Sequence, residues 1–203
     1  LRDGLATMGL SLDEDRQEKL LAFLGLLNKW NRAYNLTAVR DERVMVSRQL
    51  LDSLSILPWV TTDHLLDVGA GGGLPGIPLA IALPEKRFTL LDSNGKKTRF
   101  LFQAKTSLSL ENVTIVNDRV EAYHPPEPFD MIVSRAFASL ADMTGWCKHL
   151  RADHGCFLAM KGQYPQQEID DLKGQFEVTQ VTELRIPGVD GERHLLRLLP
   201  VVS

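Results

Sequence analysis

The chain has 203 residues, a formal net charge of −3 and an ordinary globular composition, with 44% hydrophobic and 24% charged residues. This length permits a buried core without disulfides, and no apolar run reaches the roughly 18 residues of a membrane-spanning helix. The negative charge excludes a protein that coats nucleic acid through bulk charge, although local basic patches remain possible.

Residues 1–60 have the pattern of helices. Ser11 and Glu14 form a capping-box signature, and apolar residues then recur at helical spacing as far as Tyr34. A second helix is predicted over 42–57, ended by Pro58. No linker follows, so we expect residues 1–60 to be an N-terminal helical extension packed on the rest of the chain.

Residues 61–203 alternate short apolar runs with helical stretches, which predicts an α/β domain with a mostly parallel sheet. A turn at 188–191 indicates that the last two strands form a hairpin, and hence an antiparallel C-terminal edge. A further helix is expected near 138–150. The expected strands are His64–Val68, Arg87–Leu91, Val113–Val116, 130–134, 156–160, 176–186 and 194–199.

A glycine-rich loop at 69–76 follows the first predicted strand. Glycine is needed where the backbone takes positive φ or approaches a ligand closely, and the first strand–helix turn of such a sheet is where cofactors bind. Gly71, Gly73 and Gly76 spell G-x-G-x-x-G, the pattern of dinucleotide sites. The loop alone therefore leaves a nicotinamide-dependent oxidoreductase open.

Acidic residues near this loop favour S-adenosylmethionine. Asp67 precedes Gly69 by two positions, where a carboxylate suits a cationic cofactor and would repel a pyrophosphate. Asp92 ends the second strand, where it can accept ribose hydroxyls, and residues 118–121 follow the third strand, where they can meet adenine. The nicotinamide alternative and a small-molecule methyltransferase both remain open at this point.

The two cysteines argue for a reducing compartment. Cys147 and Cys156 form no C-x-x-C pair, so we expect a cytoplasmic protein. They lie near His149 and His154, but the C-x-H spacing is too tight for a usual zinc site. We expect no metal.

Several segments together resemble one family, the small-subunit ribosomal RNA methyltransferase G family, also called glucose-inhibited division protein B. They are 28–37, 66–81, 90–92, 129–137, 160–162 and 191–194. The resemblance runs from about residue 15 to 199. It implies a Rossmann-like S-adenosylmethionine-dependent methyltransferase of seven strands with N-terminal helices. It also implies transfer of a methyl group to N7 of one guanine of 16S rRNA, usually numbered 527.

Site residues follow from the glycine loop, the strand ends and this resemblance. One departure is Gly72, where relatives can carry proline. The resemblance implies that the cofactor is bound by Gly69, Leu74, Val120, Glu121 and Arg135. The glycine pattern and the end of the second strand add Gly71, Gly73 and Asp92 as expected cofactor-binding residues.

The end of the fourth predicted strand agrees with N7 chemistry. Guanine N7 has a free lone pair and no proton, so no general base is needed. Residues 134–137 read Ser-Arg-Ala-Phe, without the Asp-Pro-Pro-Tyr-like motif of amine methyltransferases or the cysteine of a cytosine-C5 enzyme. Arg135 is a positioning candidate that could hold the methionine carboxylate, a phosphate or the guanine edge, or form a structural ion pair.

Basic and aromatic residues supply candidates for RNA contact, although each of them also has a plain surface or core role open to it. An acidic protein binds naked RNA weakly, so we expect the partner to be 16S rRNA within the 30S subunit or a precursor. The RNA-binding candidates are Lys96, Lys97, Arg99, Phe137, Lys161, Arg193 and His194.

Overall fold

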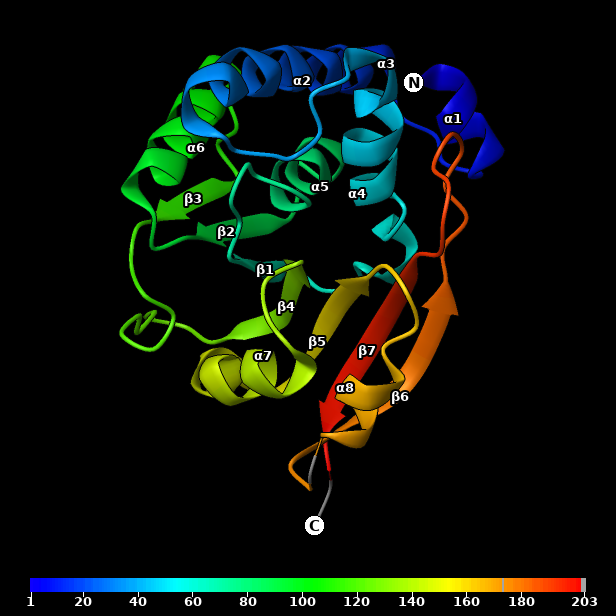
Figure 1. Cartoon of the computed structure of the whole chain (residues 1–203). Coiled ribbons are helices and arrows are strands. Elements are labelled where there is room, and N and C mark those ends of the chain that lie inside the picture. Colours follow the sequence, from blue (N-terminus) through cyan, green and yellow to red (C-terminus); the bar gives the residue numbers. More distant parts are fainter. Residues whose placement is uncertain (173, 202–203) are drawn as a thin grey trace.

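A seven-stranded sheet with the order β3-β2-β1-β4-β5-β7-β6 runs through the computed structural model, which describes residues 1–172 and 174–201 (Figure 1). The five strands from β3 to β5 are mutually parallel, and β7 is antiparallel to both β5 and β6. This confirms the predicted mostly parallel sheet with an antiparallel edge. The strands are β1 His64–Val68, β2 Arg87–Leu91, β3 Val113–Val116, β4 Phe129–Arg135, β5 Arg151–Lys161, β6 Phe176–Glu183 and β7 His194–Pro200.

Helices cover both faces of the sheet (Figure 1). One face carries α2, α5 and α6 together with the short helices of the N-terminal segment, and the other carries α7. The helices are α1 Arg2–Thr7, α2 Glu14–Tyr34, α3 Glu42–Met45, α4 Asp52–Leu54, α5 Gly76–Ala82, α6 Gly95–Ser107, α7 Leu140–Cys147 and α8 Gln166–Asp170. A π-helical segment, η1 Val46–Leu51, joins α3 to α4, and two short 3₁₀ turns are η2 Leu57–Trp59 and η3 Lys148–Leu150.

The helix α2 shares one hydrophobic core with the sheet. Its residues Phe23 and Leu27 are fully buried in the same cluster as Phe88 of β2 and Phe100 of α6. The rings of Phe23 and Phe100 lie 6.2 Å apart between centroids. The first 60 residues therefore supply part of the core that covers this face of the sheet.

Two predicted helix boundaries are wrong. The N-cap of α2 is Asp13, whose Oδ1 accepts the amide of Arg16 at 2.8 Å, rather than the predicted box of Ser11 and Glu14. The helix predicted over 42–57 ends at Leu54, so Pro58 does not end it and lies instead in the 3₁₀ turn η2. Between α3 and α4 this helix also passes through η1, in which the hydrogen-bond spacing widens. Both errors arise where a competing polar cap or a local change of helical period leaves no trace in hydrophobic spacing.

Two strand boundaries also differ. β5 begins at Arg151 rather than 156, because a register shift lets its polar start pair with the beginning of β4. Gly155 permits this approach, since a β-carbon there would lie 2.8 Å from the carbonyl oxygen of Phe129. β6 ends at Glu183 instead of 186.

No helix within residues 1–172 and 174–201 has both the length and the apolar character needed to cross a membrane.

Because α2 and the sheet share a core, we expect residues 1–60 and 61–203 to unfold as one unit. Phe23→Ala should lower the free energy of unfolding by about 3–5 kcal/mol, the usual cost of emptying a buried aromatic site. Leu21→Ala on the same helix is the control, because Leu21 is 48% exposed and its loss should cost little. Chemical denaturation would measure both. A two-step transition in which Phe23→Ala affects only one step would contradict the shared core.

Candidate functional site

A first cavity of about 350 Å³ opens at the carboxyl ends of the parallel strands. The chain leaves β1 toward β2 in one direction and leaves β4 toward β5 in the other, so the edge beside β1 and β4 is the switch point where ligands bind in such sheets. The first cavity is lined by Val68 and Gly69 at the end of β1, Leu91, Asp92 and Ser93 at the end of β2, Asp118, Arg119, Val120 and Glu121 after β3, Ala136 and Phe137 after β4, Lys97 of α6 and Trp146 of α7.

The glycine loop needs glycine at its turning points. Gly69, Gly71 and Gly73 have φ of 69°, 55° and 80°, in the left-handed region that other residues rarely adopt. A β-carbon on Gly69 would also overlap the ring of Phe137. The loop can therefore bend sharply beneath the cavity and bring its backbone close to whatever occupies it.

The carboxylate of Asp92 is fixed at the tip of β2. Oδ2 accepts the amide of Gly71 at 2.9 Å and Oδ1 accepts the amide of Asn94 at 2.8 Å. Asp92 is 7% exposed and lines the first cavity, and Lys97 Nζ lies 3.9 Å from its Oδ2. Since each carboxylate oxygen can accept more than one hydrogen bond, this group can also accept ribose hydroxyls.

Aromatic and apolar side chains also line the first cavity. The rings of Phe137 and Trp146 meet edge to face with centroids 5.9 Å apart, and Val120 adds an apolar side chain beside the carboxylate of Glu121. These features fit an adenosine-bearing cofactor. Asp92 is a buried acceptor for ribose, the apolar side chains offer a slot for a purine, and Gly69 leaves the wall without a β-carbon. S-adenosylmethionine meets these requirements.

Not every expected cofactor residue lines this cavity. Gly71, Gly73 and Leu74 lie in the loop behind the wall, where Leu74 is buried in the core and Gly71 holds Asp92. Arg135 lines a different cavity, described below. The structure thus brings Gly69, Asp92, Val120 and Glu121 together.

Asp67 is closed off beneath the loop. It is 1% exposed, and its Oδ2 accepts the amide of Gly76 at 2.8 Å, whereas Oδ1 has no hydrogen-bond partner. Burial raises the pKa of Asp67 to about 7, against the opposing effects of the Gly76 hydrogen bond and of Arg135. The carboxylate therefore accepts a hydrogen bond from the start of α5 and does not face the first cavity. This contradicts the hypothesis that Asp67 contacts the cation of the cofactor directly.

A second cavity, of about 400 Å³, adjoins the first at Ala136, which lines both. Ala136 has φ of 54°, a strained value for a residue with a β-carbon. This bend sends Arg135 to the second cavity and Phe137 to the first. The second cavity is lined by Thr37, Val39, Arg48, Gln49, Asp52, Arg135, Ala136, Met160, Lys161, Gly162, Leu184, Arg193 and His194.

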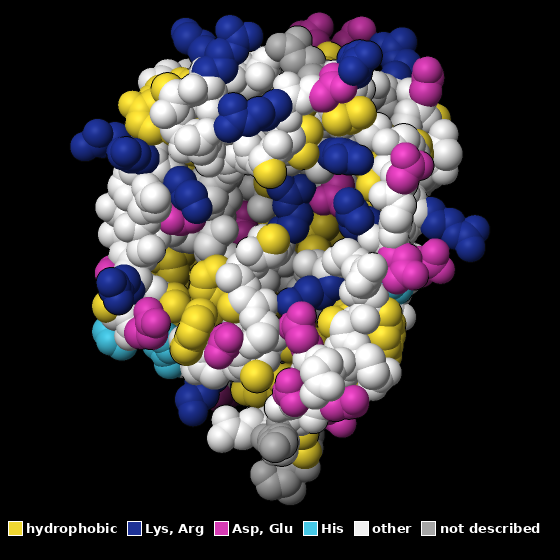
Figure 2. All heavy atoms as spheres, in the orientation of Figure 1, with side chains coloured by type: hydrophobic (Ala, Val, Ile, Leu, Met, Phe, Trp, Pro, Cys, Tyr) yellow, Lys and Arg dark blue, Asp and Glu magenta, His cyan; other side chains and the backbone are white. Residues whose placement is uncertain are grey.

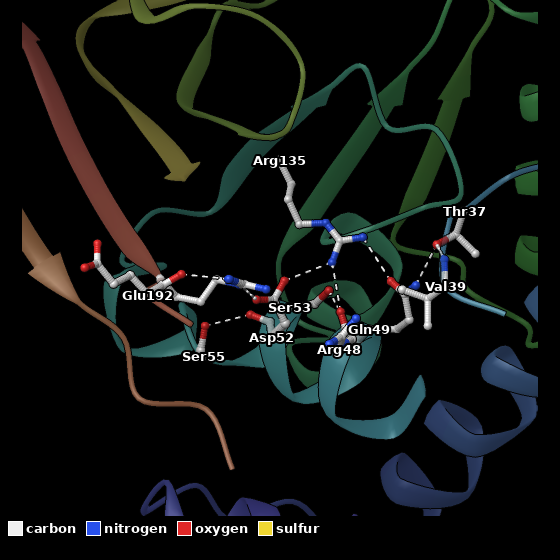
Figure 3. Close-up of polar contacts among 10 residues, drawn as sticks. Thr37, Val39, Arg48, Gln49, Asp52, Ser53, Ser55, Arg135 and Glu192 are labelled. Atoms are coloured by element: carbon white, nitrogen blue, oxygen red, sulfur yellow. Dashed lines mark hydrogen bonds and ion pairs between the residues drawn. The ribbon is translucent and has the colours of Figure 1, made fainter. Parts of the chain in front are cut away.

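Arg135 reaches from the end of β4 to the N-terminal helices (Figure 3). Its Nη1 donates to Oδ2 of Asp52 at 2.9 Å, and its Nη2 donates to Oε1 of Gln49 at 3.0 Å. The sequence left several roles open for Arg135. The geometry shows that Arg135 forms an ion pair with Asp52 of α4. Sequence analysis missed Asp52 and Gln49, although a carboxylate amid the leucines of 50–54 was a signal for a buried acid.

The RNA-binding candidates lie in three places. Lys161 and His194 line the second cavity with Arg193, but Lys161 Nζ is bound to Glu168 at 2.8 Å, and His194 Nδ1 lies 2.9 Å from the carbonyl oxygen of Gly162. Phe137 and Lys97 line the first cavity. Lys96 and Arg99 are exposed on α6 and line neither cavity.

No group of three His, Cys, Asp or Glu residues in the described part of the chain is arranged to hold a metal ion. Cys147 and Cys156 are buried free thiols.

Two solved structures of similar fold are a methylase and a methyltransferase. Ribosomal protein L11 methylase from Lactobacillus delbrueckii subsp. bulgaricus matches with a TM-score of 0.57 and 16% identity, over 74% of this chain and 76% of that chain. Coclaurine N-methyltransferase, solved with N-methylheliamine and S-adenosylhomocysteine, matches with a TM-score of 0.57 and 14% identity, over 80% of this chain and 58% of that chain. The fold is that of the Rossmann-like S-adenosylmethionine-dependent methyltransferases.

Sequence comparison narrows this class to one family. The family model described as rRNA small subunit methyltransferase G matches residues 16–196. Ribosomal RNA small subunit methyltransferase G of Marinobacter nauticus is 67% identical over 196 residues, which are 97% of this chain and 92% of the relative. The chain belongs to the rRNA small subunit methyltransferase G family. The nicotinamide-dependent oxidoreductase left open by the glycine pattern is therefore set aside.

Gly69→Ala tests the glycine loop. The added methyl group would meet the Phe137 ring and strain a residue with φ of 69°. We expect S-adenosylhomocysteine binding to weaken at least tenfold in isothermal titration calorimetry. Gly25→Ala is the matched control, because its β-carbon would meet open space on α2. Wild-type affinity in Gly69→Ala would show that the loop does not shape the first cavity.

The buried Asp67 predicts a pH dependence of stability. Because its pKa is near 7 in the folded protein and near 4 when unfolded, the folded state holds an extra proton between these values. The free energy of unfolding should therefore fall as pH rises from 4 to 7, by up to about 4 kcal/mol from this group. Asp67→Asn should remove this component, measured as the wild-type-minus-variant difference across pH 4–8. If the difference in free energy of unfolding between wild type and Asp67→Asn does not change with pH, Asp67 does not have the raised pKa.

Proposed function

We propose that this protein transfers a methyl group from S-adenosylmethionine to N7 of one guanine of 16S rRNA, the guanine usually numbered 527. We further propose that it acts in the cytoplasm on the 30S subunit or a precursor. The observation that supports this function best is the junction of the two cavities at Ala136. A cofactor in the first cavity and an acceptor base in the second would meet there.

The residues proposed to hold the cofactor lie at the strand ends. Asp92 would accept the ribose hydroxyls, Val120 and Glu121 would border the adenine, and the turn at Gly69 would let the backbone approach the amino-acid part. Bound S-adenosylmethionine supplies an electrophilic methyl group on a positively charged sulfur. The chain contributes binding, alignment and exclusion of water.

The reaction needs no proton transfer. The lone pair of guanine N7 forms the new bond to carbon while the carbon–sulfur bond breaks, and the electron pair of that bond stays on sulfur. The methylated base then carries the positive charge that sulfur loses. Catalysis accordingly rests on position and electrostatics, which agrees with the absence of a cysteine or an Asp-Pro-Pro-Tyr-like motif at the end of β4.

Small ribosomal subunits from cells lacking the family enzyme provide the test. With radiolabelled S-adenosylmethionine, we expect about one methyl group per subunit, mapped by chemical cleavage at a single N7-methylguanine. Subunits from methylation-competent cells are the control and should take up little label. Label at another atom, or equal labelling of both preparations, would overturn the proposed acceptor. Equal labelling of protein-free 16S rRNA would overturn the proposed particle.

A further inference from the structure

Four cationic side chains line the second cavity. Arg48, Arg135, Lys161 and Arg193 border it, and Asp52 is the one carboxylate among its described lining residues. This basic lining contrasts with the net charge of −3 of the whole chain. Figure 2 shows Lys and Arg side chains gathered around the hollow in the middle of this face.

Asp52 holds two of these arginines together. Its Oδ2 accepts Nη1 of Arg135 at 2.9 Å and its Oδ1 accepts Nε of Arg193 at 3.2 Å. The Asp52 side chain is 6% exposed, whereas those of Arg135 and Arg193 are 24% and 31% exposed. The carboxylate is thus buried behind two guanidinium groups that remain partly open to the cavity, and charge-assisted bonds fix their orientation.

A second contact sets the plane of Arg135. Gln49 accepts from its Nη2 and donates through Nε2 to Oγ1 of Thr37 at 2.7 Å. Thr37 is itself held by Asn31 of α2, whose Oδ1 accepts the Thr37 amide at 2.9 Å. The N-terminal helices therefore fix the guanidinium of Arg135 in the second cavity.

Fixed guanidinium groups discriminate between purines. Guanine presents O6, an acceptor, beside N7, whereas adenine presents an amino group at that position. An arginine has donors only, so it can bind guanine O6 and would face the adenine amino group donor to donor. The lone pair of N7 stays free for methyl transfer as long as the donors contact O6 alone.

Resting on the proposed methyltransferase function, we propose that the second cavity is the acceptor site for the target guanine. Arg135 and Arg193 are its donors toward O6, and Asp52 is the positioning residue that orients both. This assigns Arg135 to the acceptor, where its guanidinium lies, rather than to the cofactor expected from the family resemblance.

Asp52→Asn tests the positioning role, because asparagine keeps the size of the side chain but loses the charge that both arginines share. We expect S-adenosylhomocysteine affinity within twofold of wild type and a loss of at least 100-fold in kcat/KM for small subunits. Asp52→Glu should recover part of this loss. Asp63→Asn is the control, since Asp63 is an exposed carboxylate outside both cavities. Unchanged transfer in Asp52→Asn would overturn the role of Asp52, and loss of cofactor affinity in Arg135→Lys would assign Arg135 to the cofactor.

A binding measurement keeps the inference separate from the proposed function. With S-adenosylhomocysteine saturating the first cavity, guanosine 5′-monophosphate should give saturation-transfer NMR signals that adenosine 5′-monophosphate does not. Arg135→Lys and Arg193→Lys retain the positive charge opposite Asp52, so they carry the test if Asp52→Asn does not fold, and both should weaken the guanosine signal. Equal signals from the two nucleotides, or from wild type and variants, would overturn the acceptor site even if methyl transfer is observed. Guanosine-selective binding without transfer to small subunits would overturn the proposed function alone.

Discussion

The parallel pairing of β1 with β2 on one side and β4 on the other is the constraint on which the rest of the molecule depends. Parallel strands end at the same edge of the sheet, and the connections that leave β1 and β4 in opposite directions keep that edge open. The glycine loop, Asp92 and the bend at Ala136 all follow the ends of these three strands. The two cavities adjoin at Ala136 because β4 is the neighbour of β1, although residues 69–128 separate the two strands in the chain.

Sequence pattern predicted the sheet well because its strands are short apolar runs bounded by glycine, proline or acidic residues. β1, β2 and β3 match their predicted bounds. The pattern failed where geometry depends on something other than hydrophobic spacing. Asp13 took the cap of α2 because its side chain reached the Arg16 amide, and the polar start of β5 became a strand through a bulge against β4. The π-helical segment η1 likewise widens the helical hydrogen-bond spacing, which the spacing of apolar residues does not reveal.

The first cavity was within reach of sequence reasoning, since each wall follows a strand end that the pattern predicts. Asp92 and the pair Val120 and Glu121 line it for that reason. The second cavity was not within reach of sequence reasoning, because Asp52 binds Arg135 and Arg193, which lie 83 and 141 residues away in the chain. No periodicity or motif encodes such a meeting. It depends on how α4 packs against the carboxyl ends of β4 and the start of β7, which only the folded arrangement reveals.

The hydrogen-bonded path from Asn31 through Thr37 and Gln49 to Arg135 has a consequence for protein engineering. A recognition module joined to a catalytic domain by a linker can be exchanged for another module without disturbing the catalytic domain. Here the N-terminal helices provide core residues and also hold a side chain at the end of β4, so the two parts have no separable boundary. A chimaera with a foreign N-terminal segment would have to restore both the packing of Phe23 and the polar partners of Arg135. Changes in target choice are therefore more accessible through single substitutions around the cavities than through exchange of whole segments.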